Sequence, residues 1–274
     1  MSEAALTAVL RRDRMIVAGA MALLVVLAWS YVLWLVHAMS MGGMEMSDVR
    51  MDANPLGVAM RPSVQPWSGT EFAFMFVMWV VMMVGMMTPS VAPMILIYAR
   101  VGRQAEMQGK PLAATGYFAA GYLLSWIAFS LVATIGQWLL ERASLLTPMM
   151  ASTSSILAGL VLVVAGLFQW TPVKDVCLKY CQSPLIFIQH HGGFRRDPFG
   201  SLSVGFRHGL YCVSCCWALM VLLFVGGIMN VVWIAGIALF VLAEKVFPFG
   251  EVLSRITGVV LFVAGIWLIA AAVL

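Results

Sequence analysis

Seven long apolar segments are the feature that most restricts how this chain of 274 residues can fold. A helix of about 20 apolar residues crosses the hydrocarbon core of a bilayer and satisfies its own backbone there. Charged residues make up only 10% of the chain, against about 25% in soluble domains. We therefore predict an all-α fold, a polytopic membrane helix bundle with about seven transmembrane helices in a single domain (1–274). The predicted segments are 15–36, 72–98, 113–139, 149–169, 209–227, 230–247 and 253–273.

The distribution of basic residues predicts how this bundle lies in its membrane. Arginine and lysine gather near the N-terminus, in the 99–112 segment and in the 170–208 segment, and the connections between these are poorer in them. Short loops rich in Arg and Lys remain in the cytoplasm. We therefore expect a cytoplasmic N-terminus, a cytoplasmic loop at 170–208 and an outer loop at 37–70.

A group of thiols begins the fifth apolar segment. Cys212, Cys215 and Cys216 follow the i, i+3, i+4 spacing that places side chains on one face of a helix, and His208 lies one turn earlier. Sulfur ligands select soft metals such as Cu(I), and lipid offers a thiol no polar partner. A free cysteine also packs as a small hydrophobe. The pattern therefore leaves a metal site and simple packing open.

Methionine is concentrated where the chain leaves the first apolar segment. The chain has 21 methionines. Thioethers bind soft cations while staying neutral, and a flexible polar loop has little need of methionine for packing. The alternative is that this loop lies on the membrane surface. We interpret its start as a capture site for a soft metal, with the candidate ligands His37, Met39, Met41, Met44 and Met46.

A second run of methionines lies inside the 72–98 segment. Met82 and Met86 share one helical face, and Met83 and Met87 flank it. The next six residues are Thr-Pro-Ser-Val-Ala-Pro, and because prolines remove backbone donors we expect a kinked or unwound helix there. Freed carbonyls in a membrane must face protein or a water-lined cavity. We consider the four methionines candidate metal ligands, with core packing as the alternative.

The expected cytoplasmic loop carries the other two cysteines. Cys177 and Cys181 are one helical turn apart, a spacing that differs from that of zinc fingers. With the orientation above they lie near the same leaflet as Cys212, so all five cysteines are expected in one layer, reduced rather than disulfide-bonded. Glu244 is interpreted either as a solvated helix end or as a metal ligand or acceptor for the histidine. Lys245 is expected to extend to the membrane surface.

Several functional classes lack their sequence signatures. There is no basic run interleaved with aromatic residues, so no nucleic acid partner is expected. There is no phosphate-binding loop, dinucleotide fingerprint, HExxH or GxSxG motif. A pump with its own nucleotide domain is therefore excluded for this polypeptide, and a binding protein is favoured over an enzyme.

Several motifs between residues 70 and 270 form a recognisable pattern. They are Met82–Ser90 with Ala92–Met94, Gln169–Lys174, Cys177–Leu178, Cys181–Leu185, Gly209–Met220, Phe224–Asn230 and Glu244–Lys245. On these motifs the chain resembles an uncharacterised bacterial family of predicted metal-binding integral membrane proteins, a domain of unknown function. It departs from the family pattern at Val213-Ser214 and at Gln182, which are not candidate ligands. The resemblance implies metal binding, and with the spans it implies the bacterial inner (cytoplasmic) membrane.

We therefore expect a soft-metal binding membrane protein that transports or delivers its metal. Copper as Cu(I) is the expected ion, with another transition metal as the alternative. Because thiolate binds Cu(I) more tightly than thioether, methionines outside and cysteines inside favour inward delivery. The expected partners are the lipid bilayer, the metal ion, and a metallochaperone or a membrane enzyme complex.

Two other functions remain open. The chain is either a metal-containing subunit or assembly factor of a membrane enzyme complex, or a membrane thiol oxidoreductase. In the second case, Cys177 with Cys181 and Cys212 with Cys215 would be the exchanging pairs.

Overall fold

The computed structural model describes residues 3–48, 67–147 and 150–273, with side chains described for 15–38 and throughout the other two ranges. The regular secondary structure of these ranges is helical, which confirms the predicted all-α class. The helices are α1 (Glu3–Asp48), α2 (Gly69–Met107), α3 (Thr115–Arg142), α4 (Ser155–Phe168), α5 (Pro172–Gln182), α6 (Pro184–His190), α7 (Pro198–Val221), α8 (Leu223–Gly226), α9 (Val231–Val246) and α10 (Gly250–Val273).

Five helical stretches of the described chain are long and apolar enough to cross a membrane. They are the Met15–Ala38 part of α1, then α2, α3, α7 together with α8, and α10. The other two predicted segments form shorter helices: α9 has 16 residues, and α4 has 14 and bends by 67° into α5. Counting α4 and α5 as one broken span gives up to six. These helices are compatible with a multi-pass membrane protein.

The bend between α4 and α5 follows from the local sequence. Pro172 at the start of α5 has no amide hydrogen with which to continue α4. The Thr171 hydroxyl caps the new helix by accepting a hydrogen bond from the amide of Lys174 at 3.4 Å. The chain therefore turns here, and α5 carries its two cysteines against α7.

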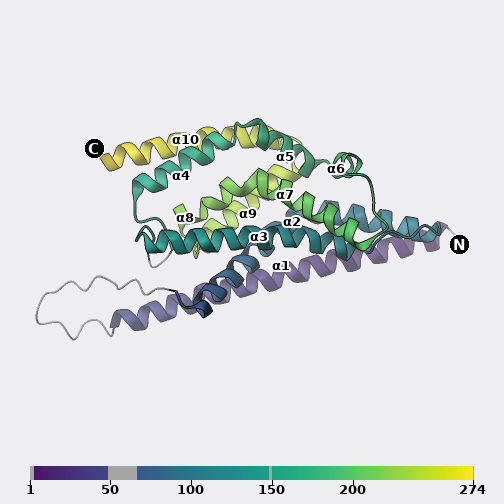
Figure 1. The fold of residues 1–274 in the computed structure, drawn as a ribbon, viewed down its shortest axis with the longest axis horizontal. Helices are drawn as coiled ribbons and strands as arrows, with labels where there is room; N and C mark the ends of the chain where they lie inside the picture. The colour runs from purple at the N-terminus through teal and green to yellow at the C-terminus, as the bar shows by residue number, and fades with distance from the viewer. Residues whose placement is uncertain (1–2, 49–66, 148–149, 274) are drawn as a thin grey trace, which may run out of the picture.

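Most helices run along the long axis of the molecule (Figure 1). The α1 helix packs along α2 on one side, and α4 pairs with α10 on the opposite side. Between them lie α3, α7 and α9. The α1 helix begins at one end of the bundle, and α10 finishes at the other. The interior is therefore formed where α2, α3, α5, α7 and α9 contact one another.

The helix α2 is continuous through its two prolines. Pro89 and Pro93 both lie inside it, so the expected unwinding does not occur. The hydroxyls of Thr88 and Ser90 donate to backbone carbonyls four and three residues earlier, at 2.7 and 2.8 Å. Side-chain hydroxyls of this kind re-satisfy the backbone around a proline in an apolar helix.

The α3 and α7 helices approach so closely that glycine is needed at the contact. A Cβ on Gly121 of α3 would meet the backbone of Leu202, and one on Gly205 of α7 would meet the carbonyl group of Phe118. Backbone atoms cannot move aside as the end of a flexible side chain can. This contact fixes how α7 is rotated against α3.

We expect Gly205→Ala to destabilise the fold by about 1–3 kcal/mol, because the added methyl group must push two helices apart. Gly116→Ala is the matched control, since no atom lies within 4 Å of a Cβ at that position of α3. Thermal unfolding of the purified protein, followed by circular dichroism, measures both. Equal Tm values for Gly205→Ala and the wild type would contradict the close contact.

Candidate metal centre

The three neighbouring cysteines of α7 face the interior of the bundle. Cys212, Cys215 and Cys216 are each at most 2% exposed. The sulfurs of Cys215 and Cys216 lie 3.1 and 2.8 Å from the carbonyl oxygen of Cys212, to which their thiols donate. The i, i+3, i+4 spacing has thus brought three thiols together away from the apolar outer surface.

A fourth thiol reaches this group from α5. The sulfur of Cys181 lies 3.9 Å from the sulfur of Cys215, and its side chain also interacts with Cys212. Cys177 is buried one turn earlier and lies close enough to Cys215 for an electrostatic interaction. All five cysteines are free thiols. We call Cys181, Cys212, Cys215 and Cys216 the thiol cluster.

Lys245 of α9 extends its ammonium group into the thiol cluster. Its Nζ donates to the sulfur of Cys212 at 2.8 Å and to the hydroxyl of Ser90 at 3.3 Å. Its positive charge acts on all four thiols. The side chain is buried, so the expectation that it extends to the membrane surface is wrong. The protein itself therefore places a cation against the thiol cluster, in contact with Cys212.

Tyr122 links the thiol cluster to α2. Its hydroxyl lies 3.2 Å from the sulfur of Cys212 and donates to the carbonyl oxygen of Met87, also at 3.2 Å. The ring is fully enclosed by the bundle. Neither Tyr122 nor Lys245 belongs to a sulfur or histidine pattern, so the sequence did not predict that they contact this cluster. Their roles depend on which helices become neighbours.

Glu244, next to the buried lysine, is part of a separate ion pair. Its carboxylate accepts hydrogen bonds from Nζ of Lys174 at 2.9 and 3.1 Å, and both side chains are buried. Its backbone carbonyl accepts from the amide nitrogen of Gln182 at 2.7 Å. The carboxylate of Glu244 thus forms an ion pair with Lys174 of α5 and is not the hydrogen-bond acceptor of His208 of α7. This pair fastens α5 to α9 beside the thiol cluster.

His208 lies one turn before the cysteines and is 3% exposed. Its Nδ1 atom is buried without a hydrogen-bond partner. Its ring packs edge-on against Phe187, with centroids 4.7 Å apart, and interacts electrostatically with Cys212 and Cys215. A buried ring nitrogen without a partner beside the thiol cluster is available to a ligand.

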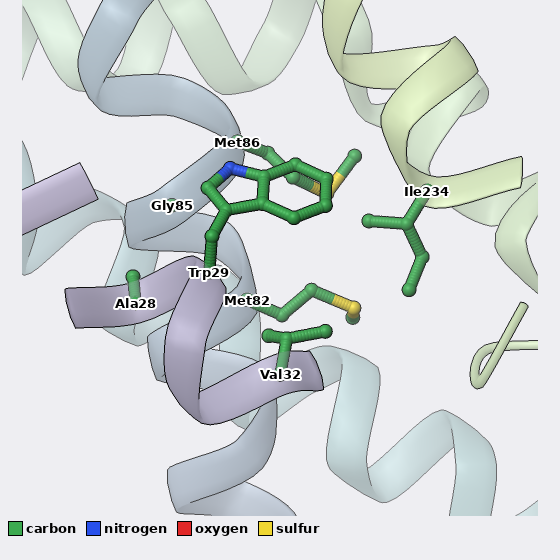
Figure 2. Close-up of a pocket in the computed structure, with 7 residues that line it drawn as sticks. All are labelled: Ala28, Trp29, Val32, Met82, Gly85, Met86 and Ile234. Carbon is green, nitrogen blue, oxygen red and sulfur yellow. The ribbon is translucent and has the colours of Figure 1, made fainter. Parts of the chain in front are cut away.

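The four candidate methionines of α2 are buried in the same continuous core as the cysteines of α7. Met82 and Met86 line a narrow gap with Trp29 of α1 and Ile234 of α9. Figure 2 shows both methionine side chains extending toward Ile234, with the indole of Trp29 over Met86. The gap is too narrow to hold a water molecule. The flanking Met83 and Met87 are fully buried. Both alternatives, core packing and metal ligation, therefore remain compatible with the positions of these four side chains.

The expected outer capture site falls mostly on residues whose side chains are outside the described part. His37 is exposed near the end of α1. The helix continues to Asp48, so the first part of the expected outer loop is helical. The expected cytoplasmic loop likewise contains α5, α6 and the start of α7. The side chains at Met39, Met41, Met44 and Met46 are not described.

The described side chains hold no group of three or more His, Cys, Asp or Glu residues arranged to hold a metal ion. Two sulfurs do face each other, those of Cys181 and Cys215 at 3.9 Å. Cu(I) differs from most metals in binding stably to as few as two sulfur ligands. The arrangement therefore suits a soft monovalent ion better than a metal that needs four ligands.

The fold and this site together define a helical bundle with an apolar exterior and, inside it, a thiol cluster in contact with a buried lysine. The chain belongs to the copper chaperone family PpoB2, whose model matches residues 76–268. No curated protein and no solved structure matches it. The matched region contains the whole thiol cluster and Lys245, whereas Met39–Met46 lie outside it. Membership of this family supports a copper-related function and confirms the expected link to a metal.

Proposed function

We propose that this protein binds Cu(I) at the thiol cluster, inside the bacterial inner membrane, and delivers the ion to a partner. The observation that carries the proposal is the convergence of Cys181 from α5 with Cys212, Cys215 and Cys216 from α7. Thiol sulfur is the ligand type that best suits Cu(I), and the family is one of copper chaperones. Cu(I) is the cargo of this protein rather than a permanent part of it.

Lys245 gives the thiol cluster a way to hold and release a cation. Its ammonium already donates to the Cys212 sulfur, so an arriving Cu(I) ion competes with it for that ligand. A thiol that binds Cu(I) as thiolate releases its proton, so one proton leaves for each Cu(I) ion and the charge of the cluster changes little in a place where unbalanced charge is expensive. When Cu(I) leaves, the sulfur takes up a proton again and the ammonium group of Lys245 returns to it. The lysine thus lowers the barrier to release without adding a ligand.

His208 is the best candidate for an additional ligand. Its Nδ1 atom is buried and has no partner, and its ring is close enough to interact with Cys212 and Cys215. A neutral imidazole nitrogen binds copper readily. A sulfur pair with one added imidazole would hold the ion more firmly during transfer than the sulfur pair alone.

We propose that the ion travels from thioether sulfur to thiol sulfur. Met82 and Met86 lie on α2 among buried groups, and the same helix reaches the thiol cluster through Ser90 and the carbonyl of Met87. Thiolate binds Cu(I) more tightly than thioether, so transfer in this direction is downhill. The recipient would be a metallochaperone or a membrane enzyme complex.

The two cysteines of α5 provide a matched test. Cys181→Ser should weaken Cu(I) binding by about tenfold or more, equal to about 1.4 kcal/mol, because it removes a sulfur from the cluster. Cys177→Ser, one turn away on the same helix, should retain near wild-type affinity. Competition with a chromophoric Cu(I) chelator measures both. Equal affinities for the two variants would contradict the assignment of Cys181.

A thiol oxidoreductase is the second candidate, because the Cys181 and Cys215 sulfurs are near enough to be joined after a small movement. Such an enzyme would pass through a Cys181–Cys215 disulfide while reducing a bound quinone. Mass spectrometry of the protein after incubation with a quinone distinguishes the functions. Loss of the mass of two hydrogen atoms, which pass to the quinone, with a Cys181–Cys215 crosslink favours the enzyme, and unchanged free thiols favour copper binding.

A further inference from the structure

Two methionine sulfurs meet at a buried amide far from the thiol cluster. Gln137 of α3 is fully buried. Its Nε2 atom lies 3.3 Å from the sulfur of Met150 and 3.8 Å from the sulfur of Met75. The same nitrogen donates to Oε1 of Glu141 at 2.8 Å. We call Met75, Gln137, Glu141 and Met150 the thioether site.

The orientation of the Gln137 amide is fixed by Trp79. The indole nitrogen of Trp79 donates to Oε1 of Gln137 at 2.8 Å. Because an indole N–H can only donate, the amide oxygen must face it and the amino group must face the sulfurs. The amino group of Gln137 has two hydrogens, and three acceptors lie around it: the two thioether sulfurs and the carboxylate of Glu141. The carboxylate is much the strongest of these acceptors. Hydrogen bonding to Gln137 therefore does not by itself explain why two thioether sulfurs lie next to its amino group.

Each sulfur is carried by a well-supported backbone. Met75 belongs to α2. Met150 has a φ of 57°, in the left-handed region that a methionine rarely adopts. Backbone hydrogen bonds of neighbouring residues support this position: the amide of Thr147 donates to the carbonyl oxygen of Ala151 at 2.7 Å, and the amide of Ser152 donates to the carbonyl oxygen of Phe224 at 2.8 Å. The Met150 sulfur is thus directed inward by a backbone conformation that is otherwise unfavourable.

Glu141 supplies the charge that neutral thioethers lack. Its Oε2 atom accepts a hydrogen bond from the indole nitrogen of Trp67 at 2.7 Å, while Oε1 accepts from Gln137. Two thioethers leave the full positive charge on a bound Cu(I) ion. A carboxylate held within the same hydrogen-bonded group offsets that charge in partly buried surroundings.

The place of the thioether site in the fold suits an early position on the copper route. It lies at the end of the bundle where α1 finishes, α2 begins and α3 finishes (Figure 1). From Met75, α2 runs about 18 Å, at about 1.5 Å per residue, to Met87. The carbonyl of Met87 accepts from Tyr122, whose hydroxyl also touches Cys212. One continuous helix therefore connects the thioether site with the thiol cluster.

We propose that Met75 and Met150 form a second, weaker site for a soft monovalent cation, which receives Cu(I) before it passes to the thiol cluster. This inference rests on the proposed copper-binding function. Methionine side chains are flexible, so a small movement brings both sulfurs onto one ion while the amide of Gln137 gives way. Glu141 compensates the charge of the ion.

Silver(I), a redox-inert soft cation, tests the thioether site directly. The purified full chain carries methionines labelled with carbon-13 at their methyl groups, and NMR follows these methyls as silver(I) is added. After the thiol cluster is filled, further silver(I) should shift the resonances of Met75 and Met150 selectively. The double variant Met75→Leu/Met150→Leu should lose the weakly bound silver(I) ion of the thioether site and keep the tightly bound silver(I) of the thiol cluster. Met94→Leu, a buried methionine elsewhere in α2, should retain both.

The thiol variant Cys212→Ser/Cys215→Ser/Cys216→Ser separates the two proposals. In this variant the first silver(I) added should shift the Met75 and Met150 methyls. Unmoved Met75 and Met150 methyls in the wild type, with tight binding at the thiols, would overturn the thioether site and leave the proposed function intact. The thiol variant could instead bind silver(I) as tightly as the wild type while the Met75 and Met150 methyls shift. That result would support the thioether site and overturn metal binding by the thiol cluster.

Discussion

Replacing Cys212, Cys215 and Cys216 together by serine should abolish stoichiometric copper binding. The substitution removes three of the four sulfurs that converge inside the bundle and leaves Cys181 alone. Serine hydroxyls are hard, weak ligands for Cu(I), so we expect the affinity to fall by about a hundredfold or more, equal to about 2.8 kcal/mol. Copper per chain, measured by elemental analysis after anaerobic loading and desalting, reports the change.

The fold should survive this triple substitution, because serine is close to cysteine in volume. The helical signal and the elution volume of the variant in detergent are the controls, together with Cys177→Ser as a variant that lacks one thiol outside the cluster. A correctly folded triple variant with the wild-type ratio of copper to protein would show that the thiol cluster is packing only.

Removing the carboxylate of Glu244 should destabilise the fold by about 3–5 kcal/mol, because Lys174 would keep a buried charge without a partner. The Lys174 side chain is 0% exposed, and its Nζ bonds to both carboxylate oxygens. Glu244→Leu is the direct test. The double variant Lys174→Met/Glu244→Leu removes both charges and should recover most of the loss. Unfolding in mixed detergent measures both.

The exposed pair of Lys179 and Glu251, 3.4 Å apart, provides the control for this prediction. Glu251→Gln should change stability by about 0–1 kcal/mol, because water screens both charges. If Glu244→Leu changed stability no more than Glu251→Gln did, the buried pair would not be holding α5 against α9. If the double variant were as unstable as the single one, packing rather than charge would explain the loss.

The all-α fold class could be predicted from the sequence because the length of the apolar segments alone determines it. The segments that became α2, α3, α7 and α10 each exceed what a membrane crossing needs. Single residues within the segments determined where α4 ends and how α2 passes its prolines. Pro172 and its cap Thr171 ended α4 early, and the hydroxyls of Thr88 and Ser90 supported α2 through its prolines. Such effects depend on single residues within an otherwise apolar pattern.

The candidate site was predictable only in its sulfur ligands. The spacing of Cys212, Cys215 and Cys216 on one helix could be read directly, since helical geometry sets which side chains share a face. The contact of Lys245 with the cluster could not be foreseen, because a lysine at the end of an apolar segment ordinarily extends to the membrane surface. The hydroxyl of Tyr122 reaches Cys212 only because α3 and α7 meet at glycines.

X-ray absorption at the copper edge of the Cu(I)-loaded full chain tests the central claim most directly. The thiol cluster predicts a first shell made mainly of sulfur, with at most one nitrogen from His208, and a changed spectrum in Cys181→Ser. A first shell of oxygen and nitrogen without sulfur would contradict copper binding by the cysteines of α5 and α7.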